Sequence, residues 1–296
     1  MNISGGKAVM SRNMHKYEEL TPYEFNKEKE RASIVYVAAG PLEYHEECNA
    51  LGIDPCKGYQ WCLDAAEITG GIVFPLLPIA PAGSFPSFTR KEIQKCYSQP
   101  LFDGEYKELT GMYPGIFFSR QVCRSVYQEL LEAFALEMKF KLCVFIGSHG
   151  PAGSMLKDIV SGFGQSDCAN LEGVQNKNVG DFHGMRVMAV WSADYNRDVI
   201  RNYYTKNDIF DITRHGGLWE SALNWAVNPE YFQPEYLDET KYPQHYGALK
   251  DEHFEGCQRP SKSEYKKFTP EFANEMHNTT VKRLADDVLN IYKNLK

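Results

Sequence analysis

Three short apolar runs, separated by polar sequence with helical spacing, limit most strongly what this chain can fold into. They are ASIVYVAAG (32–40), LCVFIGSHG (142–150) and RVMAVWSAD (186–194). A run that is apolar along its whole length, rather than at every second residue, is typical of a strand in a parallel sheet whose two faces are both covered. The alternation of such strands with helices therefore predicts an α/β fold with a mainly parallel central sheet.

Two helices have clear sequence signatures. Thr21, Pro22 and Glu24 form a capping box with proline at the first helical position, which predicts a short helix before the first apolar run. The clearest amphipathic helix covers about residues 121–139. Its predicted apolar stripe consists of Val122, Val126, Leu130, Ala133 and Phe134.

The remaining elements complete a single predicted domain over residues 1–296. Helical spacing covers 59–71, and a fourth strand follows at 72–79, where two prolines restrict it to an edge or an early end. A helix preceded by glycines begins near 216, and a long helix starts at about 269 and continues to the end. Residues 228–268, rich in Tyr, Pro and charge, are interpreted as an irregular insertion or flap.

Composition argues against several classes of partner. The chain has 296 residues and a net charge of −7, with no dense basic run, which does not favour nucleic acid or an anionic membrane. No apolar segment approaches the roughly 18–20 residues of a membrane span. The N-terminal sequence has no apolar core of a secretory signal, so we expect a cytoplasmic protein. The eight dispersed cysteines, without a CxxC pair, are expected to be free thiols.

Polar side chains collect where the predicted strands end. Glu43 and His45 follow the first apolar run, His149 ends the second, and His215 and Glu220 flank the start of the glycine-preceded helix. In a parallel sheet the loops after the carboxyl ends of the strands converge on one edge. Residues two apart in an extended segment also point the same way, so Glu43 and His45 can face one ion.

Carboxylates and imidazoles together are ligands for zinc or manganese. Asp54, downstream of Glu43 and His45, adds a carboxylate that can bridge two ions. Each residue taken alone is more simply explained as an ordinary loop or core residue. Their joint arrangement favours a metal site.

These residues also carry a resemblance to a known family. The stretch AAGPLEYHEECNALGID (38–54) resembles the first signature of the creatininase (creatinine amidohydrolase) family, with Glu43, His45 and Asp54 in register. The segments YPGIFFS (113–119), VFIGSHGPAGS (144–154) and RHGGLWESA (214–222) are similar to three further family motifs in the same order.

The resemblance implies a three-layer αβα fold, a homo-oligomer such as a hexamer, and a binuclear centre of divalent metal ions (Zn²⁺, Mn²⁺ or Fe²⁺). By motif position one ion would be held by Glu43, Asp54 and His149. The other would be held by His45, Asp54 and Glu220. Metal-activated water would attack a small cyclic substrate.

Catalytic roles follow from the same resemblance. His215 is expected to transfer protons to the leaving atom, and Glu220 to serve both as a ligand and in catalysis. The predicted function is a metal-dependent hydrolase that opens a cyclic amide or related ring at a C–N bond.

The pocket departs from the family pattern. Pro151 stands where creatinine-cleaving members have a metal-binding Glu, and Ala152 stands where the family has Asn. Glu46, Glu47 and Cys48 replace the usual Gly, Pro and His. Creatinine itself is therefore not the expected substrate, and Pro151 leaves open whether one or two ions bind.

The sequence leaves other interpretations open. A close variant is a hydrolase that opens a ring C–C bond in a cyclic diketone sugar of inositol catabolism. A non-catalytic family member would bind a metal or ligand without turnover. A nucleotide-binding α/β protein would use GSHGPAGS as a phosphate loop, but that loop lacks both the P-loop Lys-Ser/Thr and the GxGxxG spacing.

Overall fold

A computed structural model describes residues 12–81, 115–163, 178–209, 215–238, 240–242 and 262–295. Its centre is a five-stranded sheet of order β3-β1-β5-β7-β6, in which the pairs β1–β3, β1–β5 and β5–β7 are parallel and β6–β7 is antiparallel. In that order the strands span Ile72–Val73, Ile34–Ala39, Leu142–Gly147, Met185–Trp191 and Val179–Phe182. A two-stranded antiparallel pair, β2 (Leu42–Glu43) and β4 (Gly115–Ile116), lies beside it.

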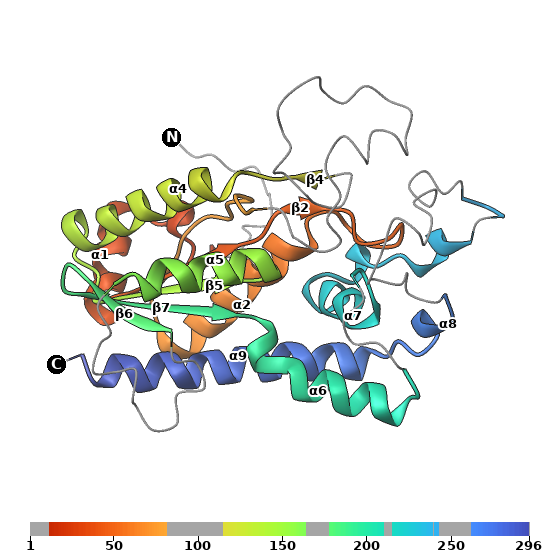
Figure 1. The fold of residues 1–296 in the computed structure, drawn as a ribbon. Helices are drawn as coiled ribbons and strands as arrows, with labels where there is room; N and C mark the ends of the chain where they lie inside the picture. Colours follow the sequence, from red (N-terminus) through yellow and green to blue (C-terminus); the bar gives the residue numbers. More distant parts are fainter. Residues whose placement is uncertain are drawn as a thin grey trace, which may run out of the picture.

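Helices cover both faces of the sheet (Figure 1). One layer comprises α2 (Ile53–Thr69), α6 (Ala193–Lys206), α7 (Leu218–Val227) and α9 (Pro270–Lys293). The other comprises α1 (Pro22–Arg31), α4 (Arg120–Glu132) and α5 (Gly150–Ser161). Short helical segments make up the rest of the described structure, namely η1 (Tyr17–Glu19), η2 (Ala133–Glu137), η4 (Pro229–Tyr231), η5 (Pro234–Leu237) and α8 (Lys262–Tyr265).

Strand β1 shows why the sheet needs both layers. All six of its residues are buried. Successive side chains of a strand point to opposite faces, so Tyr36 joins the core under α2, α6, α7 and α9, whereas Val35 and Val37 join the core under α4 and α5. The predicted three-layer αβα fold with a mainly parallel sheet is confirmed.

Several local predictions are also confirmed. Thr21 and Glu24 form the expected capping box at the start of α1, with Pro22 in its first turn. Strand β3 is short and lies at the sheet edge, directly before the segment that contains Pro75. None of the described helices combines the length and apolarity that a membrane crossing needs.

The predicted apolar stripe of the 121–139 helix is wrong at Val122, whereas Leu130 packs partly buried against the core. Val122 is 48% exposed, and the buried face of α4 is instead formed by Cys123, Tyr127 and Leu131. Tyr127 belongs to this face because its hydroxyl donates to the carbonyl of Ile79 at 2.6 Å. The π-helical turn η2 then shifts the helical phase, which brings Phe134 into the core as predicted.

Two further elements differ from the prediction. Helix α2 begins at Ile53 rather than near residue 59, because Pro55 falls in its first turn, where proline is tolerated. The edge strand β6 had no clear sequence signal. It pairs antiparallel with β7, from Val179 opposite Met188 to Phe182 opposite Met185.

The predicted 228–268 insertion is described only in part. Residues 229–237 form the short helices η4 and η5, and this segment packs on the loop after β2. Ala50 donates its backbone N–H to the carbonyl of Tyr231 at 3.0 Å, and Gln233 donates to Cys48 at 2.7 Å. The two histidines of this predicted insertion, His245 and His253, lie outside the described residues.

Candidate metal centre

The loop after β1 supplies two of the predicted ligands. Glu43 is the second residue of β2, which pairs with Gly115 of β4, and His45 follows two residues later. Both side chains are about 1–2% exposed. The Nδ1 atom of His45 lies 3.1 Å from the Glu43 backbone carbonyl, which can only accept, so Nδ1 carries the proton and Nε2 is free to act as a ligand.

Asp54 lies in the first turn of helix α2, not in a loop as the sequence suggested. This position places its negative charge at the helix N-terminus, where the unpaired backbone N–H groups stabilise it. Gly40 permits the arrangement: a Cβ atom there would lie 2.9 Å from the Asp54 backbone carbon and Cβ. The end of β1 therefore passes directly against the start of α2.

His149 links strand β5 to helix α5. It is the N-cap residue of α5, but its side chain makes no capping hydrogen bond to that helix. The imidazole instead turns to the carboxylates: Nδ1 lies 3.1 Å from Glu43 Oε1 and 3.2 Å from Asp54 Oδ2. Pro151, the departure noted in the sequence, lies in the first turn of α5, which is a favourable place for proline.

His215 and Glu220 come from the start of helix α7. Glu220 Oε2 accepts a 2.6 Å hydrogen bond from the backbone N–H of Gly216, which leaves Oε1 facing the cluster. Gly216 has a φ of +68°, and a Cβ atom there would meet the His45 carbonyl carbon at 2.8 Å. Only glycine allows this loop to approach His45 so closely.

The three side chains Glu43, Asp54 and His149 have the arrangement of metal ligands. Glu43 Oε1 and Asp54 Oδ2 are buried and have no hydrogen-bond partner among the described residues. Both nevertheless lie within 3.2 Å of the same nitrogen of His149. In a tetrahedral site with bonds of roughly 2.0–2.2 Å, ligand atoms lie about 3.3–3.5 Å apart. The donor set and these separations fit one divalent ion.

A second group adjoins the first through Asp54. His45 Nε2 lies 3.6 Å from Asp54 Oδ2 and 3.9 Å from Glu220 Oε1, so these three residues could also hold an ion. The two groups are the two ligand sets that the sequence resemblance implied. The structure brings all five predicted ligands together.

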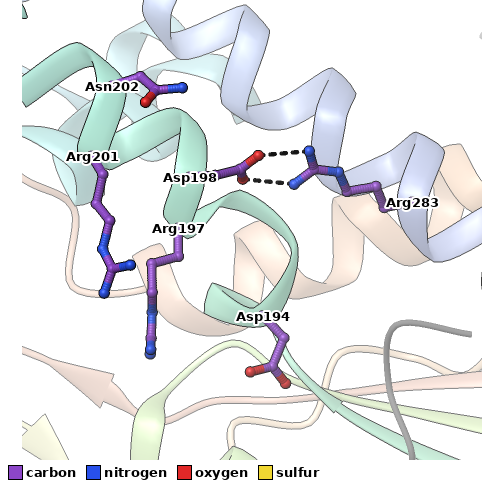
Figure 2. Close-up of a pocket in the computed structure, with 6 residues that line it drawn as sticks. All are labelled: Asp194, Arg197, Asp198, Arg201, Asn202 and Arg283. Atoms are coloured by element: carbon purple, nitrogen blue, oxygen red, sulfur yellow. Dashed lines mark hydrogen bonds and ion pairs between the residues drawn. The ribbon is translucent and has the colours of Figure 1, made fainter.

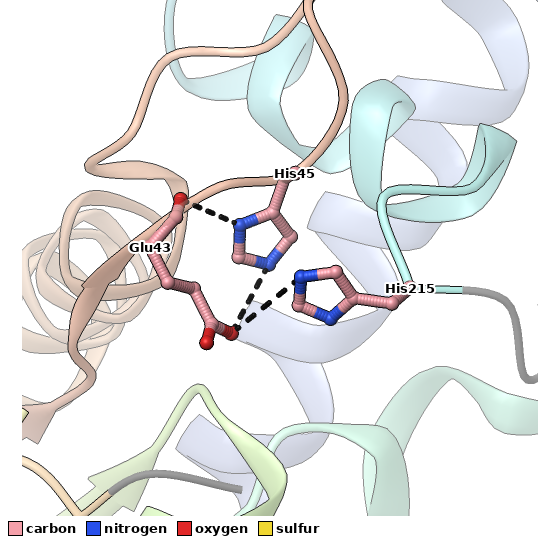
Figure 3. A group of neighbouring side chains, drawn as sticks. All are labelled: Glu43, His45 and His215. Atoms are coloured by element: carbon pink, nitrogen blue, oxygen red, sulfur yellow. Dashed lines mark hydrogen bonds and ion pairs between the residues drawn. The ribbon is translucent and has the colours of Figure 1, made fainter. Parts of the chain in front are cut away.

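His215 lies beside both groups (Figure 3). Its ring stacks on that of His45 with centroids 4.2 Å apart, and its Nε2 lies 3.8 Å from Glu43 Oε1. Glu43, His45 and His215 form a third potential ligand set. Nε2 also lies 2.6 Å from the carbonyl of Tyr44, and because a carbonyl only accepts, Nε2 carries the proton and Nδ1 is the free nitrogen.

The charges in this buried cluster determine its protonation. Burial opposes ionisation of Glu43 and Asp54, but nearby cations outweigh burial and lower both pKa values. Burial also opposes charging of His149, yet Glu43 and Asp54 raise its pKa to about 10. For His45 burial and the neighbouring His215 prevail and lower the pKa, so its ring favours the neutral form that a metal ligand needs.

Lys57 is a member of the cluster that sequence reasoning missed. It is completely buried, and its Nζ lies 2.7 Å from Asp54 Oδ1 and 3.9 Å from Glu220 Oε1. Burial disfavours its charge, but Asp54 and Glu220 outweigh burial and raise its pKa. Sequence reasoning missed it because the predicted helix began near residue 59, so Asp54 and Lys57 were not recognised as residues at i and i+3 on one helix face.

Cys48 is not part of these groups. It is buried in the core under α9, and burial raises the pKa of its thiol. A separate polar depression lies on the surface between α6 and α9, where Arg283 holds Asp198 through two bonds of 2.7 Å (Figure 2). Its lining contains none of the predicted site residues and consists of Asp194, Arg197, Asp198, Arg201, Asn202 and Arg283.

These observations define the class of protein: a three-layer αβα fold with a histidine–carboxylate cluster at the carboxyl edge of its sheet. No family model matches the sequence, and no curated protein matches it. Solved structures do match. A crystal structure of creatinine amidohydrolase (creatininase) aligns over 93% of this chain and 96% of its own, with a TM-score of 0.61 and 16% identity.

Two further creatininase structures agree with this match. A manganese form aligns over 94% of this chain and 98% of its own, with a TM-score of 0.63 and 15% identity. A Zn–Zn form of a creatininase variant aligns over 95% and 99%, with a TM-score of 0.63 and 16% identity. The chain therefore has the creatininase fold over almost its whole length.

Proposed function

We propose that this protein is a metal-dependent hydrolase of the creatininase family that opens a cyclic amide or a related ring at a C–N bond. The observation that carries the proposal is the convergence of Glu43 Oε1 and Asp54 Oδ2 on one nitrogen of His149, without hydrogen-bond partners among the described residues. Two buried carboxylate oxygens that share a single histidine nitrogen are costly, and a divalent ion relieves that cost. The matched creatininase structures include manganese and Zn–Zn forms.

Glu43, Asp54 and His149 would hold such an ion. When bound, it would supply Lewis acidity, which polarises a carbonyl and lowers the pKa of water. His215 is the group best placed to move a proton. Its side chain is 18% exposed, more than Glu43, Asp54, His45, His149 or Glu220, so a substrate can reach it.

The hydrogen bond to Tyr44 fixes how His215 would act. With Nε2–H committed to the Tyr44 carbonyl, Nδ1 is the atom that accepts a proton and then gives it to the leaving nitrogen. Burial opposes the charged ring, but Glu43, Glu220 and the Tyr44 carbonyl outweigh it and raise the pKa of His215. These neighbours therefore stabilise the protonated ring that forms during turnover.

We propose a cyclic substrate other than creatinine. Pro151 and Ala152 offer neither the carboxylate nor the amide that the family pattern has beside the strand-end histidine. Both residues lie in the first turn of α5, which begins directly after His149. The Ala152 side chain packs into the core under α4 and α5, and neither residue has a hydrogen-bonding side chain to offer at this turn.

The test is a screen of metal-loaded protein against cyclic amides and cyclic ketones, with creatinine included. We expect hydrolysis of a cyclic amide that is lost on chelation and regained on adding Zn²⁺ or Mn²⁺. Glu43→Gln should abolish both metal binding and turnover, whereas Glu30→Gln, on the exposed surface of α1, should change neither. Protein that binds no divalent ion after metal-supplemented expression would contradict the proposal.

A further inference from the structure

Lys57 brings a fixed positive charge into the candidate metal centre. It lies one turn after Asp54 on α2 and is completely buried. Its ammonium group donates to Asp54 Oδ1 at 2.7 Å and lies 3.9 Å from Glu220 Oε1. Trp219 borders the same group, with its ring centroid 5.7 Å from Nζ. A buried ammonium held between two carboxylates is a structural feature of the site rather than a solvated surface charge.

The ammonium group contacts two of the three residues that a second ion would need. That second site would consist of His45, Asp54 and Glu220. Glu220 has one oxygen to offer, because its Oε2 already accepts from Gly216. The remaining oxygen, Oε1, lies 3.9 Å from both Lys57 Nζ and His45 Nε2. An ion held by these residues would therefore lie against the ammonium.

Charge balance distinguishes one ion from two. The carboxylates of Glu43, Asp54 and Glu220 are all buried, and they carry three negative charges when ionised. One divalent ion and the Lys57 ammonium balance those charges, whereas two divalent ions and the ammonium leave an excess of two positive charges. Unbalanced charge in a buried site is strongly unfavourable. The Lys57 side chain therefore disfavours a second ion electrostatically.

We propose that Lys57 takes the place of the second metal ion, so that the centre holds one divalent ion through Glu43, Asp54 and His149. The inference rests on the proposed function, because it presupposes that these residues bind metal. It also revises the binuclear centre that the sequence resemblance implied. In this chain the second cation is supplied by a side chain, and it orients Asp54 by holding Oδ1 while Oδ2 faces His149.

The test is metal stoichiometry in full-length protein expressed with excess Zn²⁺ or Mn²⁺ and then dialysed. Wild type should retain about one ion per chain, and Lys57→Met should retain about two. Lys57→Arg keeps the charge and should stay near one. Lys157→Met, which removes a partly exposed lysine paired with Asp194, is the matched control and should also stay near one. If Lys57→Met does not fold, Lys57→Gln replaces it.

Electron paramagnetic resonance of the Mn²⁺-loaded proteins provides an independent readout. Wild type should give the hyperfine pattern of an isolated ion, and Lys57→Met the pattern of an exchange-coupled pair. Two ions in wild type would overturn the Lys57 inference and leave the proposed hydrolase intact. One ion in both wild type and the Lys57→Met or Lys57→Gln protein would also overturn it, because removal of the charge would not have opened a second site. No ion in wild type would overturn both proposals.

Discussion

At the scale of single residues, Asp54 is the side chain that contacts both the histidines of the centre and Lys57. Its Oδ2 faces His149 and His45, and its Oδ1 accepts from Lys57. No other described carboxylate has this double contact. The whole arrangement therefore depends on both oxygens of one side chain, and loss of its charge has to affect metal binding directly.

We predict that Asp54→Asn lowers the affinity for metal by roughly 10- to 100-fold or more, because a neutral amide replaces a charged ligand. The purified variant should therefore contain less metal than wild type. Elemental analysis of the purified variant measures this. Asp64→Asn is the matched control, since Asp64 lies on the same helix and pairs with His277 away from the cluster. Full metal content in Asp54→Asn would exclude Asp54 as a ligand.

The role proposed for His215 separates chemistry from metal binding. We predict that His215→Ala keeps its metal but loses turnover by roughly 100- to 10,000-fold, the usual contribution of a positioned acid–base group. Added imidazole should restore part of the rate. The measurements are metal content, turnover and melting temperature, with the exposed His183 replaced by Asn as the control.

Other outcomes for His215→Ala have distinct meanings. Loss of metal would make His215 a ligand, in line with the third group that it forms with Glu43 and His45. Unchanged turnover with a lower melting temperature would leave it only a structural role through its bond to Tyr44.

At the scale of elements, the turn before α7 determines whether Glu220 reaches the centre. Gly216 combines a positive φ with close contact to the backbone of His45. Its carbonyl also accepts hydrogen bonds from Ser221 and Tyr265, and its N–H donates to Glu220. The turn thus holds α7 against the loop that carries His45.

We predict that Gly216→Ala lowers the free energy of unfolding by about 2–4 kcal/mol, because it combines backbone strain with steric overlap. Gly184→Ala is a sharp control: Gly184 has a φ of +83°, but a Cβ atom there meets nothing within 4 Å. It should cost only about 1 kcal/mol. Urea unfolding of both variants separates the steric contribution to the free energy of unfolding from the contribution of backbone strain. Equal losses of unfolding free energy in the two variants would show that the contact with His45 is unimportant.

At the scale of the whole molecule, bound metal should couple the two halves of the chain. The candidate ligands come from β2, the loop after it, α2, the start of α5 and α7. Glu43, Asp54 and Glu220 are buried carboxylates in close proximity, and a bound divalent ion adds positive charge to that cluster. Binding to the folded state alone stabilises it through mass action.

We predict that chelation lowers the melting temperature by about 5 °C, from a stabilisation of about 3 kcal/mol at 100-fold saturation. Calorimetry with and without added Zn²⁺ measures this shift. In Asp54→Asn the shift should disappear. A shift of equal size in that variant would place the stabilising metal elsewhere in the chain.

The sequence by itself determined the parallel strands β1, β5 and β7 and named the candidate ligands. Apolar runs such as 142–147 are buried wherever they occur in a covered sheet, so their hydrophobicity alone predicts their place. The positions of Glu43 and His149 relative to strand ends likewise follow from local order along the chain. Strand ends in a parallel sheet share one edge, which is why the sequence alone suffices to group these distant residues.

Only the tertiary structure decided which side chains face the same point. The buried face of α4 depends on the bond from Tyr127 to Ile79 and on the π-helical turn, neither of which has a local signal. Lys57 carries no sign of burial in the sequence, because lysine is ordinarily solvated. Its role emerges when α2 begins early enough to place Asp54 one turn before it and α7 brings Glu220 to the same ammonium. Contacts between distant segments, rather than local propensity, set the charge balance of the centre.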